Sequence, residues 1–170
     1  MLQSEEGIDF YETFAPVARL EAIRLLLAFA CFTNFKLFQM DVKSAFLNGF
    51  ITEKVFVKQP PGFENYAHPD HVFKLQKILY GLKQAPQTWY EILSKFLIEN
   101  DFSRGHVDIT LFLKKKNDDL LVVQIYIDDI IFGATNEILC QEFAKLMQGM
   151  FEMSMMGELN FFLRTPNQAN

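Results

Sequence analysis

The sequence predicts an α+β fold in which an antiparallel sheet is backed by helices. Stretches with apolar residues at helical spacing alternate with short β-rich segments. Short, turn-prone connections join these segments, which favours antiparallel strands over parallel ones. We find no internal repeat and no low-complexity linker, and 170 residues, half of them hydrophobic, suit one domain with a substantial core.

The first helix is predicted over residues 20–33, whose apolar side chains recur at helical spacing. Residues 37–46 (LFQMDVKSAF) are typical of a strand that runs into a short turn. Residues 54–63 alternate lysine with apolar residues and stop at Pro-Pro-Gly, and 64–72 form a polar loop. The expected buried face of the first helix consists of Leu20, Ile23, Leu27 and Ala30.

The second half of the chain begins with a helix predicted to start at Pro86, because proline is tolerated in a first turn. Its apolar stripe consists of Trp89, Leu93, Phe96 and Leu97. Two β-rich segments, 109–116 and 120–127, follow, and a turn at 117–119 joins them. The remaining expected elements are a strand over 129–135, a helix capped by Asn136 and a short strand over 157–163.

Composition limits the function classes. The net charge of −5 argues against an autonomous nucleic-acid binder, although it leaves a local basic groove open. The longest apolar run, 25–32, is too short to span a bilayer, and the acidic start lacks the order of a signal peptide, so we expect no membrane or secretory role. Cys31 and Cys140 lie far apart without a CxxC pairing; reduced, buried thiols are favoured over a disulfide.

The stretch QIYIDDIIFG places Asp128 and Asp129 side by side inside an apolar segment, beside a tight turn. Asp41 lies at the end of another strand, where its side chain can point away from the helix-covered face. If the two strands are neighbours, three carboxylates converge, and divalent cations would relieve their repulsion. Hard oxygen ligands favour Mg²⁺. The alternative is a solvated turn, which is our interpretation of Asp118-Asp119.

Several motifs together resemble the copia-type LTR-retrotransposon reverse transcriptase, the RNA-dependent DNA polymerase of a Pol polyprotein. They are QMDVKSAFLNG, VFVKQPPGFE, KLQKILYGLKQAPQTWY and QIYIDDIIFGAT, and the match runs in order from about residue 5 to 163. The resemblance implies a reverse-transcriptase palm with part of the fingers over 1–163, followed by a divergent tail over 164–170. It also implies two-metal transfer of nucleotides from dNTPs to a primer 3′-hydroxyl, with Mg²⁺, or Mn²⁺ in its place, as the cofactor.

The resemblance also implies residue roles. Asp41, Asp128 and Asp129 match the catalytic, metal-binding aspartates, with Asp41 and Asp128 carrying most of the ligation. The residues that match dNTP-binding and template-binding positions are Phe46, Gly81, Lys83, Pro86 and Tyr126. An aromatic ring at Phe46 would clash with a ribose 2′-hydroxyl.

Several of these residues also have a simpler, structural interpretation. Phe46 can be a core aromatic, and Gly81 and Pro86 can mark the start of a helix. His68 and His71 have the spacing of metal ligands, but Pro69 breaks a helical register and no cysteine or third histidine is near, so zinc is not expected.

The two ends depart from the family pattern. Relatives carry a basic fingers segment before EEGIDFYETFAPV, where this chain begins with MLQS. After NFFL, relatives continue with a glycine and a strand, whereas here Pro166 would disrupt one. We therefore expect the remaining fingers and the thumb, RNase H and integrase regions to belong to a parent polyprotein. By family the location is intracellular, in a cytoplasmic particle or the nucleus.

Three functions compete. The first is an RNA-directed DNA polymerase acting on an RNA template and a DNA primer. The second is a catalytically inactive relic of such an element. The third is a weak nucleic-acid-binding module that uses its sheet face, which is disfavoured because acids occupy the predicted centre of that face.

Overall fold

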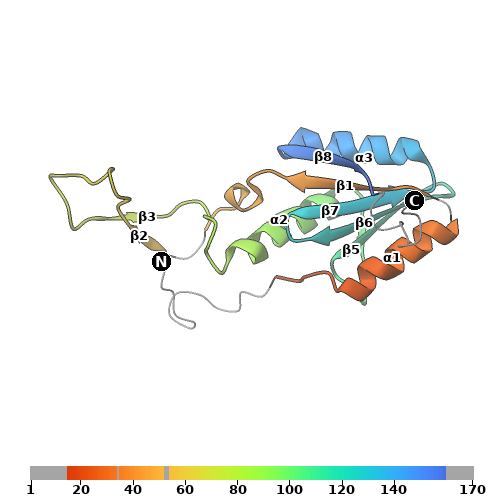
Figure 1. Ribbon diagram of the computed structural model, residues 1–170, viewed down its shortest axis with the longest axis horizontal. Coiled ribbons are helices and arrows are strands. Elements are labelled where there is room, and N and C mark those ends of the chain that lie inside the picture. The colour runs from red at the N-terminus through yellow and green to blue at the C-terminus, as the bar shows by residue number, and fades with distance from the viewer. Residues whose placement is uncertain (1–14, 34, 52–53, 160–170) are drawn as a thin grey trace, which may run out of the picture. The chain divides into compact units, whose positions relative to one another are not determined.

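The computed structural model describes residues 15–33, 35–51 and 54–159 (Figure 1). These residues form two compact units. We call Ala45–Ile92 the hairpin unit, and Pro16–Ser44 together with residues 93–159 the sheet unit. The helix α2, Ala85–Glu99, contributes its first half to the hairpin unit and its second half to the sheet unit.

The sheet unit is built on a six-stranded sheet with the order β4-β5-β6-β7-β1-β8, and every neighbouring pair is antiparallel. The predicted antiparallel sheet is therefore confirmed. Its strands are β1 (Leu37–Val42), β4 (Ser103–Arg104), β5 (Leu111–Lys116), β6 (Asp119–Tyr126), β7 (Asp129–Ala134) and β8 (Met153–Glu158).

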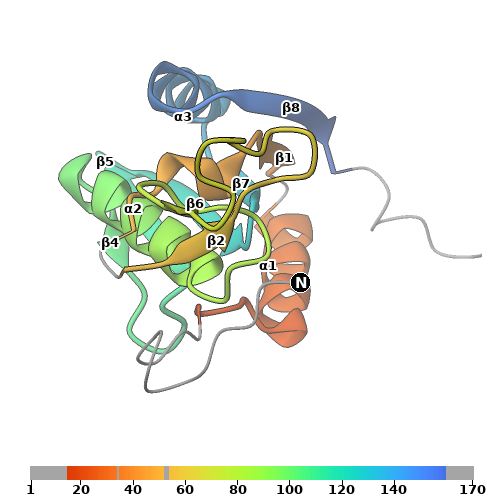
Figure 2. The ribbon, with the colours of Figure 1, turned by 90° about the vertical axis from the view of Figure 1, so that its left-hand side faces the viewer.

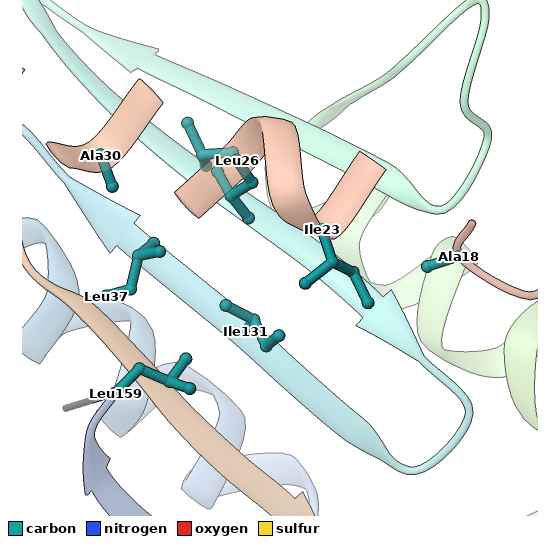
Figure 3. Packing of buried hydrophobic residues seen from close by; sticks show 8 residues of the cluster. Ala18, Ile23, Leu26, Ala30, Leu37, Ile131 and Leu159 are labelled. Carbon is teal, nitrogen blue, oxygen red and sulfur yellow. The ribbon is translucent and has the colours of Figure 1, made fainter. Parts of the chain in front are cut away.

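The helix α1, Leu20–Thr33, packs on one face of this sheet and has the predicted bounds. Figure 3 shows its buried side chains above Leu37 and Ile131 of the strands. The expected buried face was partly wrong, because Leu20 is exposed and Leu26 is buried in its place. The stripe that faces the sheet is Ile23, Leu26 and Ala30, which is also a helical spacing.

The helix α3, Glu137–Met150, packs on the opposite face. The ring centroids of Phe132 in β7 and Phe143 in α3 lie 4.9 Å apart. Asn136 caps the helix as predicted, since its side chain accepts a hydrogen bond from the backbone N–H of Ile138. Figure 2 shows the chain passing from α3 into β8.

The hairpin unit contains a 3₁₀ turn at Ala45–Asn48 and a two-stranded antiparallel sheet of β2, Phe56–Lys58, and β3, Val72–Lys74. Its core is formed by Ile78, Leu82 and Ala85. The helix α2 begins one residue before the predicted start at Pro86.

Other differences from prediction concern short elements. The segments β3 and β4 were not anticipated, because short, exposed strands carry no periodic signal. The last strand is Met153–Glu158, earlier than the expected 157–163, of which 160–163 lie outside the described residues. Both cysteines are free as expected, but Cys31 is exposed and only Cys140 is buried. None of the helices in the described part of the chain is both long and apolar enough for a membrane span.

Candidate active site

Two of the three predicted acids face each other on neighbouring strands of the sheet unit. Asp41 in β1 is the direct cross-strand partner of Asp129 in β7. Directly opposed residues in an antiparallel pair share a face, with Cβ atoms about 4.5–5.5 Å apart. The condition set by the sequence, that the strand of Asp41 lies beside the Asp128-Asp129 hairpin, is therefore met.

The third acid lies in the turn between β6 and β7. Tyr126 pairs with Asp129, which leaves Ile127 and Asp128 as a two-residue turn. The backbone N–H of Val42 donates to the Asp128 carbonyl at 3.1 Å, so the turn is tied to the end of β1. The residues of the acidic pair therefore lie at the tip of one hairpin and against one neighbouring strand.

This turn contains a strained residue. Ile127 has a φ of 58°, in the left-handed region. A β-branched side chain is rarely found there, and such a conformation costs on the order of 1–3 kcal/mol. Glycine is the usual residue at a first turn position with positive φ. Strain of this kind clusters at functional sites, which supports a functional interpretation of the turn.

The charges of the acids act on one another. Burial raises the pKa of Asp41 most strongly, and repulsion from Asp128 and then Asp129 raises it further, whereas Lys43 lowers it. The charged form of Asp41 is therefore disfavoured by its surroundings. A cation bound among these carboxylates would reverse that effect.

Two side chains that were not anticipated support the site. The Gln39 amide donates from Nε2 to Oδ1 of Asp129 at 2.9 Å. Gln39 lies two residues before Asp41 and so shares its face of β1, a spacing that could have identified it. Lys43 Nζ lies 3.1 Å from Oε1 of Glu152, so the lysine beside Asp41 is itself held by an ion pair.

The helix α1 covers part of the sheet face that carries the acids. The prediction that Asp41 points away from the helix-covered face was therefore partly wrong. Leu37 lies four residues before Asp41 in β1 and therefore shares its face. Leu37 and Ile131 are buried beneath α1 (Figure 3). The helix covers this face because Ile23 and Leu26 bury their apolar surface against it.

The carboxylates fit a divalent cation in chemistry but do not form a finished cage. Among the residues that the structure describes, no group of three or more His, Cys, Asp or Glu side chains is arranged to hold a metal ion. Mg²⁺ usually takes one or two carboxylates together with substrate phosphates and water. The hard carboxylate oxygens match that pattern, since burial and then the repulsion among the acids raise the pKa of Asp41, and a bound cation would relieve both effects.

Tyr126 is the one other predicted site residue in the sheet unit. It ends β6, pairs with Asp129 and is 38% exposed. Its ring thus belongs to the face that carries Asp129 and Asp41.

The remaining predicted residues belong to the hairpin unit. The Phe46 ring is half-buried, lies 4.8 Å from the Tyr80 ring and packs against the unit's core, as the simpler interpretation required. Gly81 has a φ of 92°, which favours glycine, and a Cβ there would meet no atom within 4 Å. Lys83 is exposed, and Pro86 lies in the first turn of α2.

The other acidic pair differs clearly from the first. Asn117 and Asp118 form the turn between β5 and β6, and Asp118 is exposed. Asp119 accepts hydrogen bonds from the Thr135 hydroxyl and the Asn136 amide, at 2.9 and 3.1 Å. Asp119 therefore has a structural role, whereas Asp118 is a solvated turn residue as expected.

Comparison with known proteins gives the same family by two routes, a family model and individual relatives. Residues 2–167 match the family model described as Reverse transcriptase (RNA-dependent DNA polymerase). The chain is 34% and 36% identical, over 92% of its length, to the retrovirus-related Pol polyproteins from transposons RE2 and RE1 of Arabidopsis thaliana. It is 32% identical, over 91% of its length, to that from transposon TNT 1-94 of Nicotiana tabacum. The chain spans only 11–12% of these three relatives.

Proposed function

The chain belongs to the reverse transcriptase family, in its copia-type branch, and from this premise we propose that its sheet unit carries the catalytic site of an RNA-directed DNA polymerase. The reaction joins the primer 3′-hydroxyl oxygen to the α-phosphorus of a dNTP, releases pyrophosphate and the hydroxyl proton, and takes its sequence from an RNA template. The observation that carries the proposal is the pairing of Asp41 with Asp129 beside the strained turn at Asp128.

In this proposal, Asp41 and Asp128 carry most of the ligation of Mg²⁺, or of Mn²⁺ in its place, and Asp129 supports the site. The bound ions supply positive charge that activates the primer hydroxyl and stabilises the leaving phosphate oxygens. Asp41 must be ionised to bind a cation, so its raised pKa means that cation binding and proton release are coupled. Gln39 is a positioning residue, because its amide fixes one oxygen of the Asp129 carboxylate.

The other residues act on the primer and the nucleotide. The exposed ring of Tyr126 lies under the terminal primer nucleotide, next to the acids. Phe46 excludes the ribose 2′-hydroxyl, and Lys83 and Pro86 belong to the segment that contacts template and incoming nucleotide. Gly81 allows the backbone to approach a base pair, which is supported by the open space beside its Cα.

The parent protein is proposed to be a Pol polyprotein that supplies the remaining fingers, the thumb, RNase H and integrase. The proposed location is intracellular, in a cytoplasmic particle or the nucleus. The first point rests on the family and on relatives whose names contain "Pol polyprotein", and the location rests on the family resemblance alone.

Primer extension on an RNA template with Mg²⁺ or Mn²⁺ tests the proposal. We expect Asp128→Asn to lower the extension rate at least about 100-fold, because it removes charge that the transition state requires. Asp118→Asn is the matched control, since it makes the same chemical change in a solvated turn and should leave the rate unchanged. Extension that both variants retain equally, or no extension by the wild-type chain, would contradict an active polymerase site and favour an inactive relic.

A further inference from the structure

A cavity of about 630 Å³ lies in the sheet unit, between α1 and the strands β5 and β6. Its walls are mostly apolar. The helix contributes Leu26 and Phe29, and the strands contribute Leu111, Leu113 and Val122. Figure 3 shows Leu26 directed from α1 toward the sheet. Sites for small organic molecules in proteins have volumes of about 300–1,000 Å³ and walls of this kind, so the cavity has the size and the surface of a ligand site.

The cavity is open to solvent, and exposed apolar side chains line it. Leu25 of α1 is 70% exposed, and Val17 and Val107, which line the cavity as well, are also exposed. Apolar side chains gathered in this way are typical of a binding surface. The lining also contains exposed charges of both signs, Arg19 and Glu21. Binding of an apolar molecule would remove the exposed apolar groups from water.

The wall formed by the sheet contains a buried polar side chain. Gln124 of β6 is 1% exposed and pairs with Ile131, which lies beneath α1, so its side chain is on the face that α1 covers. Its amide nitrogen donates to the Thr110 hydroxyl at 2.6 Å and to the Asp108 carboxylate at 3.3 Å. The Thr110 hydroxyl gives its own proton to Asp108, so it accepts from Gln124. The nitrogen of the Gln124 amide is therefore the end that faces Thr110.

The oxygen of the same amide is left without a hydrogen bond within the described part of the chain, where no donor reaches Gln124 Oε1. A buried acceptor that has lost its hydrogen bonds to water destabilises a fold until a donor satisfies it. Asp108 and Thr110 line the cavity beside Gln124, and the Asp108 carboxylate adds negative charge there. The cavity therefore favours a ligand that brings a hydrogen-bond donor, and it repels an anion.

We propose that this cavity binds a small, uncharged aromatic molecule that carries one N–H donor. The rings lie between Leu26, Phe29 and Val122, and the N–H donates to Gln124 Oε1. An aromatic body fits because it can pack against the Phe29 ring as well as against the aliphatic walls. A single donor fits because Gln124 presents one unsatisfied acceptor. The inference goes beyond the proposed function, since no acid of the candidate active site takes part in the binding.

Binding of carbazole to the full chain tests the proposal. Carbazole is a three-ring aromatic molecule with one N–H, and fluorene has the same shape with a methylene group in place of the N–H. We expect saturable binding of one carbazole per chain, followed by its fluorescence. Fluorene, measured by displacement of carbazole, should bind at least about fivefold more weakly, because it covers Gln124 Oε1 without supplying a donor. Equal affinities of the two molecules would overturn the proposal.

Replacement of the acceptor separates the hydrogen bond from the rest of the site. Gln124→Leu should remove the preference for carbazole over fluorene, and it leaves the hydrogen bond from Thr110 to Asp108 in place. A preference that persists in this variant would overturn the assignment of Gln124 as the acceptor. Thermal unfolding shows whether the variant is folded at the temperature of the assay.

Two phenylalanines of the same helix test the apolar wall, whether or not the Gln124 variant folds. Phe29→Ala should weaken carbazole binding at least about threefold, because it removes a ring from the cavity wall. Phe32→Ala is the matched control, since Phe32 is 90% exposed in α1 and does not line the cavity, so the affinity should be unchanged. Equal losses in the two variants would indicate adsorption of carbazole to exposed rings and would overturn the proposal.

A second copy of the chain is the competing occupant of the cavity. If a second copy filled it, sedimentation would show dimers, and carbazole would bind more weakly as the chain concentration rises. The proposal predicts a carbazole affinity that does not depend on the chain concentration. An affinity that falls as dimers form would therefore overturn it.

Discussion

Replacing Gly133 with alanine should displace the strand that carries Asp41. Gly133 lies in β7 opposite Leu37 of β1. A Cβ at this position would lie 2.5 Å from the Lys36 carbonyl oxygen and 2.8 Å from both Leu37 Cδ2 and Phe35 Cε2. Side chains can turn aside, but the carbonyl belongs to the backbone that leads into β1. The start of that strand must therefore move.

The cost can be estimated from these contacts. Overpacking of a dense site costs about 1–3 kcal/mol, and a gain of about 0.4–1 kcal/mol from the less flexible unfolded chain offsets part of it. A net loss of about 1–2 kcal/mol corresponds to a fall in Tm of about 2–8 °C for a chain of this size. Thermal unfolding followed by circular dichroism measures it.

Gly149 provides the control for this substitution. It lies in α3, and a Cβ there would meet nothing within 4 Å. Gly149→Ala should therefore raise the free energy of unfolding by up to about 1 kcal/mol, and Tm with it, because alanine favours the helix. A Gly133→Ala variant as stable as the wild-type chain would refute the close approach of β7 to the start of β1.

The remaining predictions concern single side chains. Asp41→Asn should raise Tm in EDTA at pH 7, because an acid whose pKa is raised in the folded state destabilises the fold once it is ionised. The gain in Tm should vanish as the pH falls below 3.8, the pKa of the acid in the unfolded chain. A gain that persists at that pH would exclude charge as its cause. Gln39→Leu should weaken Mn²⁺ binding about tenfold without a large loss of Tm, and unchanged affinity would remove Gln39 from the site. Burial raises the pKa of the Cys140 thiol to about 11, so a disulfide reagent at pH 8 should modify only the exposed Cys31 until the chain unfolds. Rapid modification of both thiols in the native protein would contradict the burial of Cys140.

Local patterns predicted most of the fold. The bounds of α1 and the cap at Asn136 follow from signals within a few residues, and so does the hairpin around Asp128. The buried face of α1 was harder, because apolar residues occupy several neighbouring faces between Ile23 and Ala30 and only packing selects among them. The strand β3 has three exposed residues and therefore no alternation to detect.

The candidate site divides in the same way. Spacing and resemblance together predicted Asp41, Asp128 and Asp129 as site residues, and the strand register shows Asp41 opposite Asp129. The spacing of Gln39 from Asp41 places it on the face of the acids, but its hydrogen-bond partner Asp129 lies 90 positions away in the sequence, and no local pattern reveals that partner. The sequence also gives no sign of the strained backbone at Ile127, since isoleucine in an apolar run is typical of an ordinary strand.

Mn²⁺ binding, measured by electron paramagnetic resonance on the full chain, tests most directly whether the three acids form one cation site. We predict that Asp41→Asn and Asp128→Asn each weaken binding at least about tenfold, because each removes a charged oxygen ligand, and that Asp118→Asn does not. Mn²⁺ affinity that is unchanged in the Asp41 and Asp128 variants would contradict a shared metal site between β1 and the β6–β7 turn. An affinity that Asp41→Asn, Asp128→Asn and Asp118→Asn lower equally would contradict it as well.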